Sequence, residues 1–143
     1  MFSGEYEYKI DAKGRVSIPP KFRGQFADGI VLSENVDGCI NAYPVQVWNE
    51  ITAKYRSQPI VQNQKDRRIS RFIFSSTFSL ELDEQGRIML PPALRQYIAI
   101  KDTLVITGVS SRLEIWSKEA WDKEKALVLK EAWQNFESEE DRK

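Results

Sequence analysis

Two arginines, Arg15 and Arg87, occupy the same place in a stretch that the chain carries twice. Residues 11–23 read DAKGRVSIPPKFR, and residues 83–95, which lie 72 positions later, read DEQGRIMLPPALR. The aspartate, the glycine, both prolines and both arginines of the motif are identical in the two copies. A guanidinium group carries a permanent charge and a planar fork of donors that suits phosphate oxygens and guanine edges. The arginine after the glycine is therefore the first candidate for contact with a charged partner.

The residues in front of each arginine predict a tight turn. An aspartate three residues before a glycine favours a hairpin with a type I turn, in which Asp11 and Asp83 accept from backbone N–H groups. Gly14 and Gly86 then take a positive φ without the penalty of a Cβ. The paired prolines should end the next strand and begin a short helix. Each copy is thus expected to contain a strand, a turn, a strand and a short helix.

Two compatible interpretations of the arginines stay open at this stage. Each arginine could form an intramolecular ion pair with its own aspartate, Asp11 or Asp83, and so lock the turn. Each could also reach an external partner, with the aspartate orienting the guanidinium group. A third interpretation, a pair of catalytic carboxylates, rests on the same two aspartates, but turn capping explains them with fewer assumptions.

Further positive charge is concentrated around the first copy's turn. The additional candidates for contact with an anionic partner are Lys9, Lys13, Lys21 and Arg23. Most surface lysines are only solvated, so each of these is a weaker candidate than Arg15. The second copy has Glu81, Gln85 and Ala93 in the places of the three lysines. We therefore expect the first copy to contribute more electrostatic energy.

Composition argues against several classes of function. The chain has no histidine, so the usual general base and metal ligand are missing, and we expect neither an enzyme nor a bound metal or other cofactor. No run approaches the roughly 20 apolar residues that span a bilayer, and residues 1–5 do not resemble a secretory signal. Cys39 is the single cysteine and can form no internal disulfide. These features predict a cytoplasmic protein.

The distribution of charge along the chain is more informative about a partner than the net charge. The formal net charge is zero, which by itself argues against a nucleic-acid partner. Residues 1–76, however, hold 11 Lys and Arg against 8 Asp and Glu, whereas residues 77–143 hold 10 against 13. A neutral chain can therefore carry a locally basic face.

The repeat extends beyond the motif, to roughly residues 5–53 and 77–126. Alternating or short apolar runs predict strands at 6–10, 15–18, 30–33, 39–43, 104–107 and 113–116. Helical spacing predicts helices at 21–26, from Pro44 to a break at 57–59, at 64–74 and at 118–136. We expect residues 1–3 to be frayed or swapped and residues 137–143 to be disordered. Because one copy alone is too small to be stable, the two should share a core through a pseudo-two-fold arrangement.

Two predicted helices also carry faces whose use stays open. The helix at 64–74 has a basic side, which is either solvated or in contact with nucleic acid or an acidic neighbour. The last helix has an apolar stripe that includes Trp121, Trp133 and Phe136. Aromatic residues on a terminal helix are more common in a core or a subunit interface than in a ligand site.

The sequence resembles the bacterial MraZ family, which belongs to the AbrB-like, swapped-hairpin DNA-binding proteins. The resemblance rests on the start MFSGEY, the twin Asp-x-x-Gly-Arg-x-x-x-Pro-Pro motifs, and LEIW at 113–116 followed by Trp121. It implies an α+β fold in which two swapped-hairpin motifs form one pseudo-two-fold, double-psi-like barrel unit. We then expect DNA-binding repeats at 5–53 and 77–122, a linker helix at 54–76, and an amphipathic C-terminal helix with an acidic tail at 123–143.

The resemblance also implies a sequence-specific, DNA-binding transcriptional regulator. The family's Asp-x-x-x-Arg element falls on Asp11 with Arg15 and on Asp83 with Arg87. Such a protein is expected to form ring-like homo-oligomers on short direct repeats of double-stranded DNA, in association with the nucleoid. It would repress the division and cell-wall gene cluster that includes its own gene. The alternative is an antitoxin-like protein-interaction module of the same fold, which grips a protein partner through its tail helix.

Overall fold

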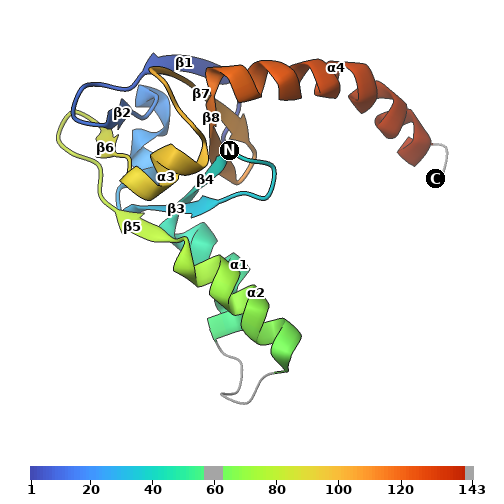
Figure 1. Cartoon of the computed structure of the whole chain (residues 1–143), viewed down its shortest axis with the longest axis horizontal. Helices are drawn as coiled ribbons and strands as arrows, with labels where there is room; N and C mark the ends of the chain where they lie inside the picture. The colour runs from blue at the N-terminus through green and yellow to red at the C-terminus, as the bar shows by residue number, and fades with distance from the viewer. Residues whose placement is uncertain (57–62, 141–143) are drawn as a thin grey trace.

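The computed structural model describes residues 1–56 and 63–140, which form an α+β protein (Figure 1). The strands are β1 (Glu5–Lys9), β2 (Arg15–Ser17), β3 (Ile30–Glu34), β4 (Ile40–Pro44), β5 (Phe78–Leu80), β6 (Arg87–Met89), β7 (Thr103–Val109) and β8 (Arg112–Ser117). The helices are η1 (Pro20–Phe26, a 3-10 helix), α1 (Val45–Arg56), α2 (Gln64–Ser75), α3 (Pro92–Tyr97) and α4 (Lys118–Glu140). These strands form a six-stranded sheet in the order β1-β7-β8-β4-β3-β5 and a two-stranded sheet, β2-β6.

Strands of the two halves pair with each other. A local hairpin would pair β1 with β2 across the first turn, but β1 pairs with β7 and β2 pairs with β6. In the second half, β5 likewise pairs with β3 of the first half. The expected turn therefore forms, but the expectation of a local hairpin is wrong. Val16, the middle residue of β2, pairs with Ile88, the middle residue of β6, and both side chains are buried. Each of these short strands therefore helps to bury the other.

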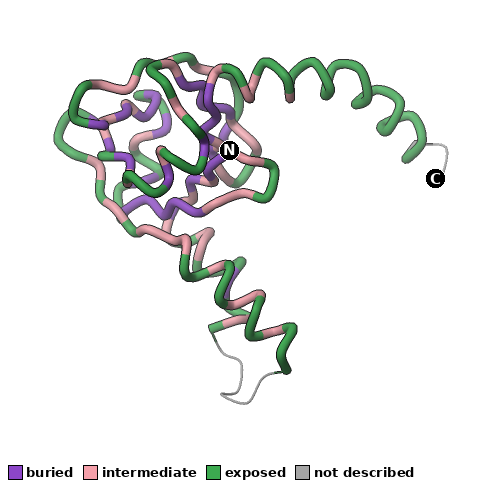
Figure 2. The backbone as a smooth tube through the Cα atoms, in the orientation of Figure 1, coloured by how far each residue is buried: buried purple, intermediate pink, exposed green. Residues whose placement is uncertain are grey.

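The shared core is built from equivalent residues of the two copies. Ile18 and Leu90, which precede the paired prolines, are fully buried, and so is Leu94 of α3. Full burial of such a side chain contributes about 1.5–3 kcal/mol. Buried backbone is concentrated in the body where the two halves meet, as Figure 2 shows. Because both copies supply this core, each turn is anchored by the other half of the chain.

The N-terminal residues belong to this core, so of the two expectations for residues 1–3, frayed or swapped, the frayed start is wrong. Phe2 is 3% exposed, and its ring centroid lies 5.1 Å from that of Phe22 and 5.3 Å from that of Phe26. Its backbone N–H donates to the carbonyl of Ser110 at 2.8 Å, and the N–H of Ser110 donates back at 3.0 Å. Phe2 thus closes one end of the core.

Helices α1 and α2 project together from the body (Figure 1). The ring of Trp48 lies 5.7 Å from that of Tyr43 and 6.3 Å from that of Phe74, so aromatic contacts join α1 to β4 and to α2. Asn63 caps α2 by accepting from the N–H of Asp66 at 2.7 Å. The predicted helix at 64–74 is therefore confirmed. The predicted break at 57–59 lies outside the described residues.

Helix α4 begins on the body and then leaves it (Figures 1 and 2). The hydroxyl of Ser117 accepts from the N–H of Ala120 at 3.1 Å, and Trp121 packs on Trp116 with ring centroids 5.6 Å apart. The helix continues to Glu140, so the expectation of disorder is wrong for residues 137–140. No glycine or proline interrupts this stretch, and glutamate is a good helix former. Among the described helices, none has the length and apolarity required to cross a membrane.

Candidate nucleic-acid interface

The first turn is held by Asp11. Its Oδ1 accepts from the backbone N–H groups of Lys13 at 2.9 Å and of Arg15 at 2.8 Å, while its Oδ2 accepts from Nε of Arg15 at 2.6 Å. Gly14 has φ of 82° and donates its N–H to the carbonyl of Asp11 at 3.0 Å. Residues that carry a Cβ rarely adopt this conformation, which explains why a glycine occupies position 14. One carboxylate thus both shapes the turn and orients the arginine.

The second turn repeats this arrangement bond for bond. Oδ1 of Asp83 accepts from the N–H groups of Gln85 and Arg87, each at 2.9 Å, and Oδ2 accepts from Nε of Arg87 at 2.9 Å. Gly86 has φ of 75° and donates to the carbonyl of Asp83 at 2.9 Å. The intramolecular interpretation of both aspartate–arginine pairs is therefore confirmed.

Backbone bonds connect the two turns. The N–H of Leu90 donates to the carbonyl of Gly14 at 2.9 Å, and the N–H of Ile18 donates to the carbonyl of Gly86 at 3.0 Å. Each turn is thus bonded to the strand that leaves the other turn. A displacement of one turn would strain the other, so the two arginines are held as one unit.

The β2–β6 ribbon presents both arginines on one face. Arg15 pairs with Met89 and Ser17 pairs with Arg87, while Val16 and Ile88 between them point into the core. Because side chains alternate along a strand, the four flanking residues share the outer face. The side chains of Arg15 and Arg87 are 28% and 26% exposed. In each pair the aspartate engages Nε, and the terminal guanidinium nitrogens have no partner among the described residues.

The carboxylates themselves are poorly suited to acid–base chemistry. The backbone N–H of Arg15 is the main cause that lowers the pKa of Asp11, and the N–H of Arg87 does the same to the pKa of Asp83. Both carboxylates are occupied as acceptors of backbone and guanidinium N–H groups, which is the turn-capping interpretation of these two aspartates.

The other sequence candidates are distributed over both turns. Lys9 and Lys13 are exposed near the first turn, and neither side chain has a partner within the described part of the chain. The ammonium of Lys21 lies 5.1 Å from the ring centroids of both Tyr6 and Phe22, which is a cation–π geometry. These three lysines surround the first copy's motif without being fixed to a carboxylate.

Arg23 does not lie beside the turn of its own copy. Its Nε donates to the carbonyl of Ile18 at 2.9 Å, and its side chain packs against Gly86 in the second turn. It shares a hollow there with three carboxylates. Those acidic neighbours are Glu81, Asp83 and Glu84.

Arg95, which the sequence argument did not select as a site residue, has the reciprocal position. Its guanidinium group lies against Gly14 of the first turn, since a Cβ on Gly14 would be 2.8 Å from Nη1. Arg95 matches Arg23 at the end of the duplicated motif, and that identity was the available signal. No pattern in the sequence indicates that each arginine reaches the turn of the opposite copy, and only the structure reveals this contact.

The structure places the basic side of α2 away from this ribbon. Arg68 and Arg71 are on the projecting helix pair, whereas β2 and β6 are on another side of the body (Figure 1). We therefore do not include α2 in the candidate interface.

The fold and paired turns define a duplicated α+β protein in which both copies build one core and one basic ribbon. Comparison with known families agrees, because the family model described as "MraZ protein, putative antitoxin-like" matches residues 1–72 and again residues 73–142. The chain belongs to the MraZ family.

Two relatives show the extent of the similarity, and both are named "Transcriptional regulator MraZ". The protein of Herpetosiphon aurantiacus is 47% identical over 121 residues, which cover 85% of this chain and 84% of the relative. The protein of Dehalococcoides mccartyi is 39% identical over 142 residues, or 99% of each chain.

Proposed function

We propose that this protein is a sequence-specific, DNA-binding transcriptional regulator. The observation that carries the proposal is the position of the partly exposed Arg15 and Arg87 on one face of the β2–β6 ribbon. Each guanidinium is held through Nε by an aspartate, and its terminal nitrogens have no partner among the described residues, so DNA could engage them. The regulatory role of the named relatives supports the same function.

A two-stranded ribbon is one of the forms in which proteins read DNA. The major groove of B-DNA admits a two-stranded ribbon, and a bidentate arginine–guanine contact contributes about 1–3 kcal/mol of discrimination. Arg15 and Arg87 would read base edges or phosphates, with Lys9, Lys13 and Lys21 as additional phosphate contacts. Arg23 is left out of the proposed contacts, because Glu81, Asp83 and Glu84 line the same hollow. Reciprocal pairing of the two halves supports a pseudo-two-fold, swapped-hairpin barrel whose DNA-binding repeats span 5–53 and 77–122.

A single subunit offers few contacts, so we include ring-like homo-oligomers in the proposal. Linked subunits that meet successive direct repeats gain affinity through effective concentration without new contacts. Helix α4 supports assembly, because Trp133 is 70% exposed and Phe136 is 56% exposed on a helix that leaves the body. We propose that such rings repress the cell-division gene cluster, including the regulator's own gene, at the nucleoid.

Gel-shift titration of the wild-type protein tests this function. The probe is the DNA upstream of its own gene, and the control is the same DNA with its bases shuffled. Tighter binding to the upstream DNA supports a specific regulator. Equal binding to both DNAs, or no binding at low salt, rejects it.

The second candidate is an antitoxin-like protein-interaction module. The exposed aromatic residues of α4 favour it, since a protein partner would also cover them. Pulldown with the intact chain distinguishes the two functions. Recovery of a stoichiometric protein partner, without DNA binding, would make this candidate the better one.

A further inference from the structure

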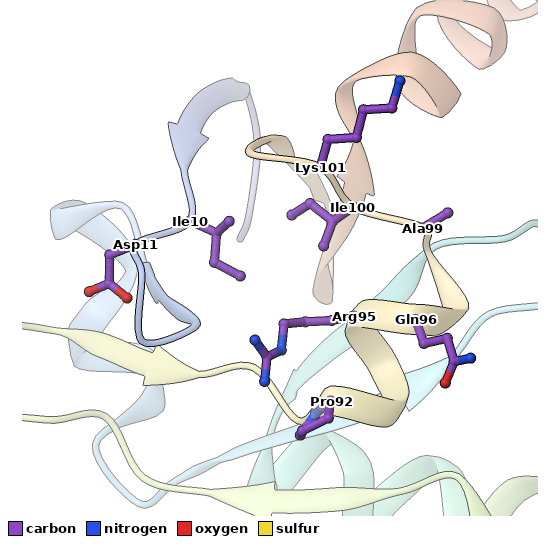
Figure 3. A pocket seen from close by; sticks show the side chains of 8 residues that line it. All are labelled: Ile10, Asp11, Pro92, Arg95, Gln96, Ala99, Ile100 and Lys101. Carbon is purple, nitrogen blue, oxygen red and sulfur yellow. The ribbon is translucent and has the colours of Figure 1, made fainter.

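An open hollow of about 680 Å³ lies between the first turn and α3. Its wall includes Ile10 and Asp11 before the turn, Arg95 and Gln96 on α3, and Ile100 and Lys101 after it. Figure 3 shows the side chain of Arg95 extending from α3 to the side of the hollow that the first turn forms. The carboxylate of Asp11 is already engaged by Arg15 and the turn, so it is not a ready partner for Arg95.

Arg95 and Arg23 occupy equivalent positions of the two copies but differ in their hydrogen bonds. Nε of Arg23 donates to the carbonyl of Ile18, and the surrounding hollow contains Glu81, Asp83 and Glu84. Nε of Arg95 is buried and lacks a hydrogen-bond partner, and no other partner of this guanidinium exists in residues 1–56 and 63–140. A buried donor without an acceptor is destabilising, so such a group requires an explanation.

We propose that the hollow beside the first turn is a phosphate subsite of the DNA interface, with Arg95 as the contacting residue. The second copy's arginine then completes the first copy's DNA contact. A phosphate oxygen in the hollow would accept from the terminal guanidinium nitrogens of Arg95, for which the described residues provide no acceptor, and a guanidinium fork suits it. The inference rests on the proposed function, since its ligand is the backbone of the bound DNA.

The charge around the hollow favours this occupant. Lys101 lies on its rim, and its ammonium points away from Arg95 (Figure 3), so Lys101 adds attraction rather than a direct contact. Lys9 and Lys13 flank the same turn. The corresponding hollow at the second turn holds three carboxylates, which would repel a phosphate. The two subsites are therefore unequal, and the one at Arg95 is the phosphate site.

The test compares Arg95→Gln with Arg23→Gln, which removes the equivalent charge from the acidic hollow. Binding of upstream DNA is followed by fluorescence anisotropy across a range of KCl concentrations. Arg95→Gln should weaken binding several-fold on upstream and shuffled DNA alike, and lower the log–log salt slope by about one unit. Arg23→Gln should retain the wild-type slope.

Gln96→Glu provides a second variant in case Arg95→Gln does not fold. Gln96 is exposed on the same wall, so a carboxylate there should weaken DNA binding without disturbing the core. A folded Arg95→Gln or Gln96→Glu with wild-type affinity and salt slope would overturn the inference. Inorganic phosphate that binds the DNA-free protein through Arg95, with DNA affinity unchanged in Arg95→Gln, would also overturn it. Failure of the wild type to bind DNA would instead reject the proposed function.

Discussion

Arg23 of the first copy lies directly over Gly86 in the second copy's turn. A Cβ on Gly86 would lie closer to Nε of Arg23 than Cβ atoms lie to neighbouring atoms in real structures. The φ of Gly86, 75°, also disfavours a side chain at this position. The reciprocal contact of Arg95 with Gly14 has the same form. Substitutions at either turn glycine should therefore disturb both halves of the interface.

Gly86→Ala should lower the free energy of unfolding by roughly 1–2 kcal/mol, because alanine at positive φ is strained. It should also weaken DNA binding, since the displaced turn carries Arg87. Urea unfolding at neutral pH measures the first effect. Gly24→Ala is the matched control, because Gly24 has no positive φ and a Cβ there meets nothing within 4 Å. Equal stability of the two variants would contradict the strain argument.

Acid should loosen both turns together. The pKa values of Asp11 and Asp83 are lowered mainly by the backbone N–H groups of Arg15 and Arg87. A carboxyl group whose pKa is lower in the folded state stabilises the fold above its unfolded pKa of about 3.9. That stabilisation is lost as the pH falls through the lowered pKa. Stability should therefore decline from about pH 4 downward, through these two groups among others.

The double variant Asp11→Asn/Asp83→Asn measures their share of the acid dependence. Its urea midpoint should fall less between pH 5 and pH 3 than that of the wild type. Glu84→Gln, an exposed neighbour of Asp83, serves as the control. An unchanged pH dependence in the double variant would show that the carboxylates do not stabilise the turns.

Phe2→Ala should destabilise the protein by about 3–5 kcal/mol, because it leaves a cavity against Phe22 and Phe26. Phe136→Ala is a matched control of the same chemistry at a residue that is 56% exposed. Thermal unfolding of dilute protein compares the two. A loss below about 1 kcal/mol in Phe2→Ala would mean that the N-terminus is not part of the core.

The sequence predicted local structure better than strand pairing. The Asp11–Gly14 spacing predicted the turn, and the alternation around Val16 predicted its buried face, because both depend on backbone geometry within a few residues. No local pattern specifies that β2 pairs with β6 or that Arg23 crosses to Gly86. These contacts depend on how the two halves interlock, which is why the sequence alone does not connect Arg95 with the first turn.

The ends of the chain show the same limit. Phe2 lies in the core because Phe22, Phe26 and Ser110 converge there from distant parts of the sequence. The position of residues 1–3 at the terminus suggested a frayed or swapped start. The acidic residues after Phe136 suggested a disordered end. In the second case helix propensity and the absence of a breaker extended α4 to Glu140.

Assembly should depend on the free part of α4. Trp133 and Phe136 pack on each other, with ring centroids 6.3 Å apart, and are otherwise largely exposed. Replacing both with alanine should reduce the particle mass in multi-angle light scattering and weaken binding to DNA with several repeats. Lys130→Ala on the same helix is the control. An unchanged mass in the aromatic double variant would place the subunit interface elsewhere.

The most direct measurement of the central claim is anisotropy titration of upstream DNA with Arg15→Ala, Arg87→Ala and their combination. Each single variant should lose about 1–3 kcal/mol of binding, or roughly 5- to 150-fold, while Lys130→Ala binds as the wild type does. Arg15→Ala should show the larger change in salt dependence, because the first turn has more positive charge around it. Wild-type affinity in a folded Arg15→Ala/Arg87→Ala double variant would contradict the account.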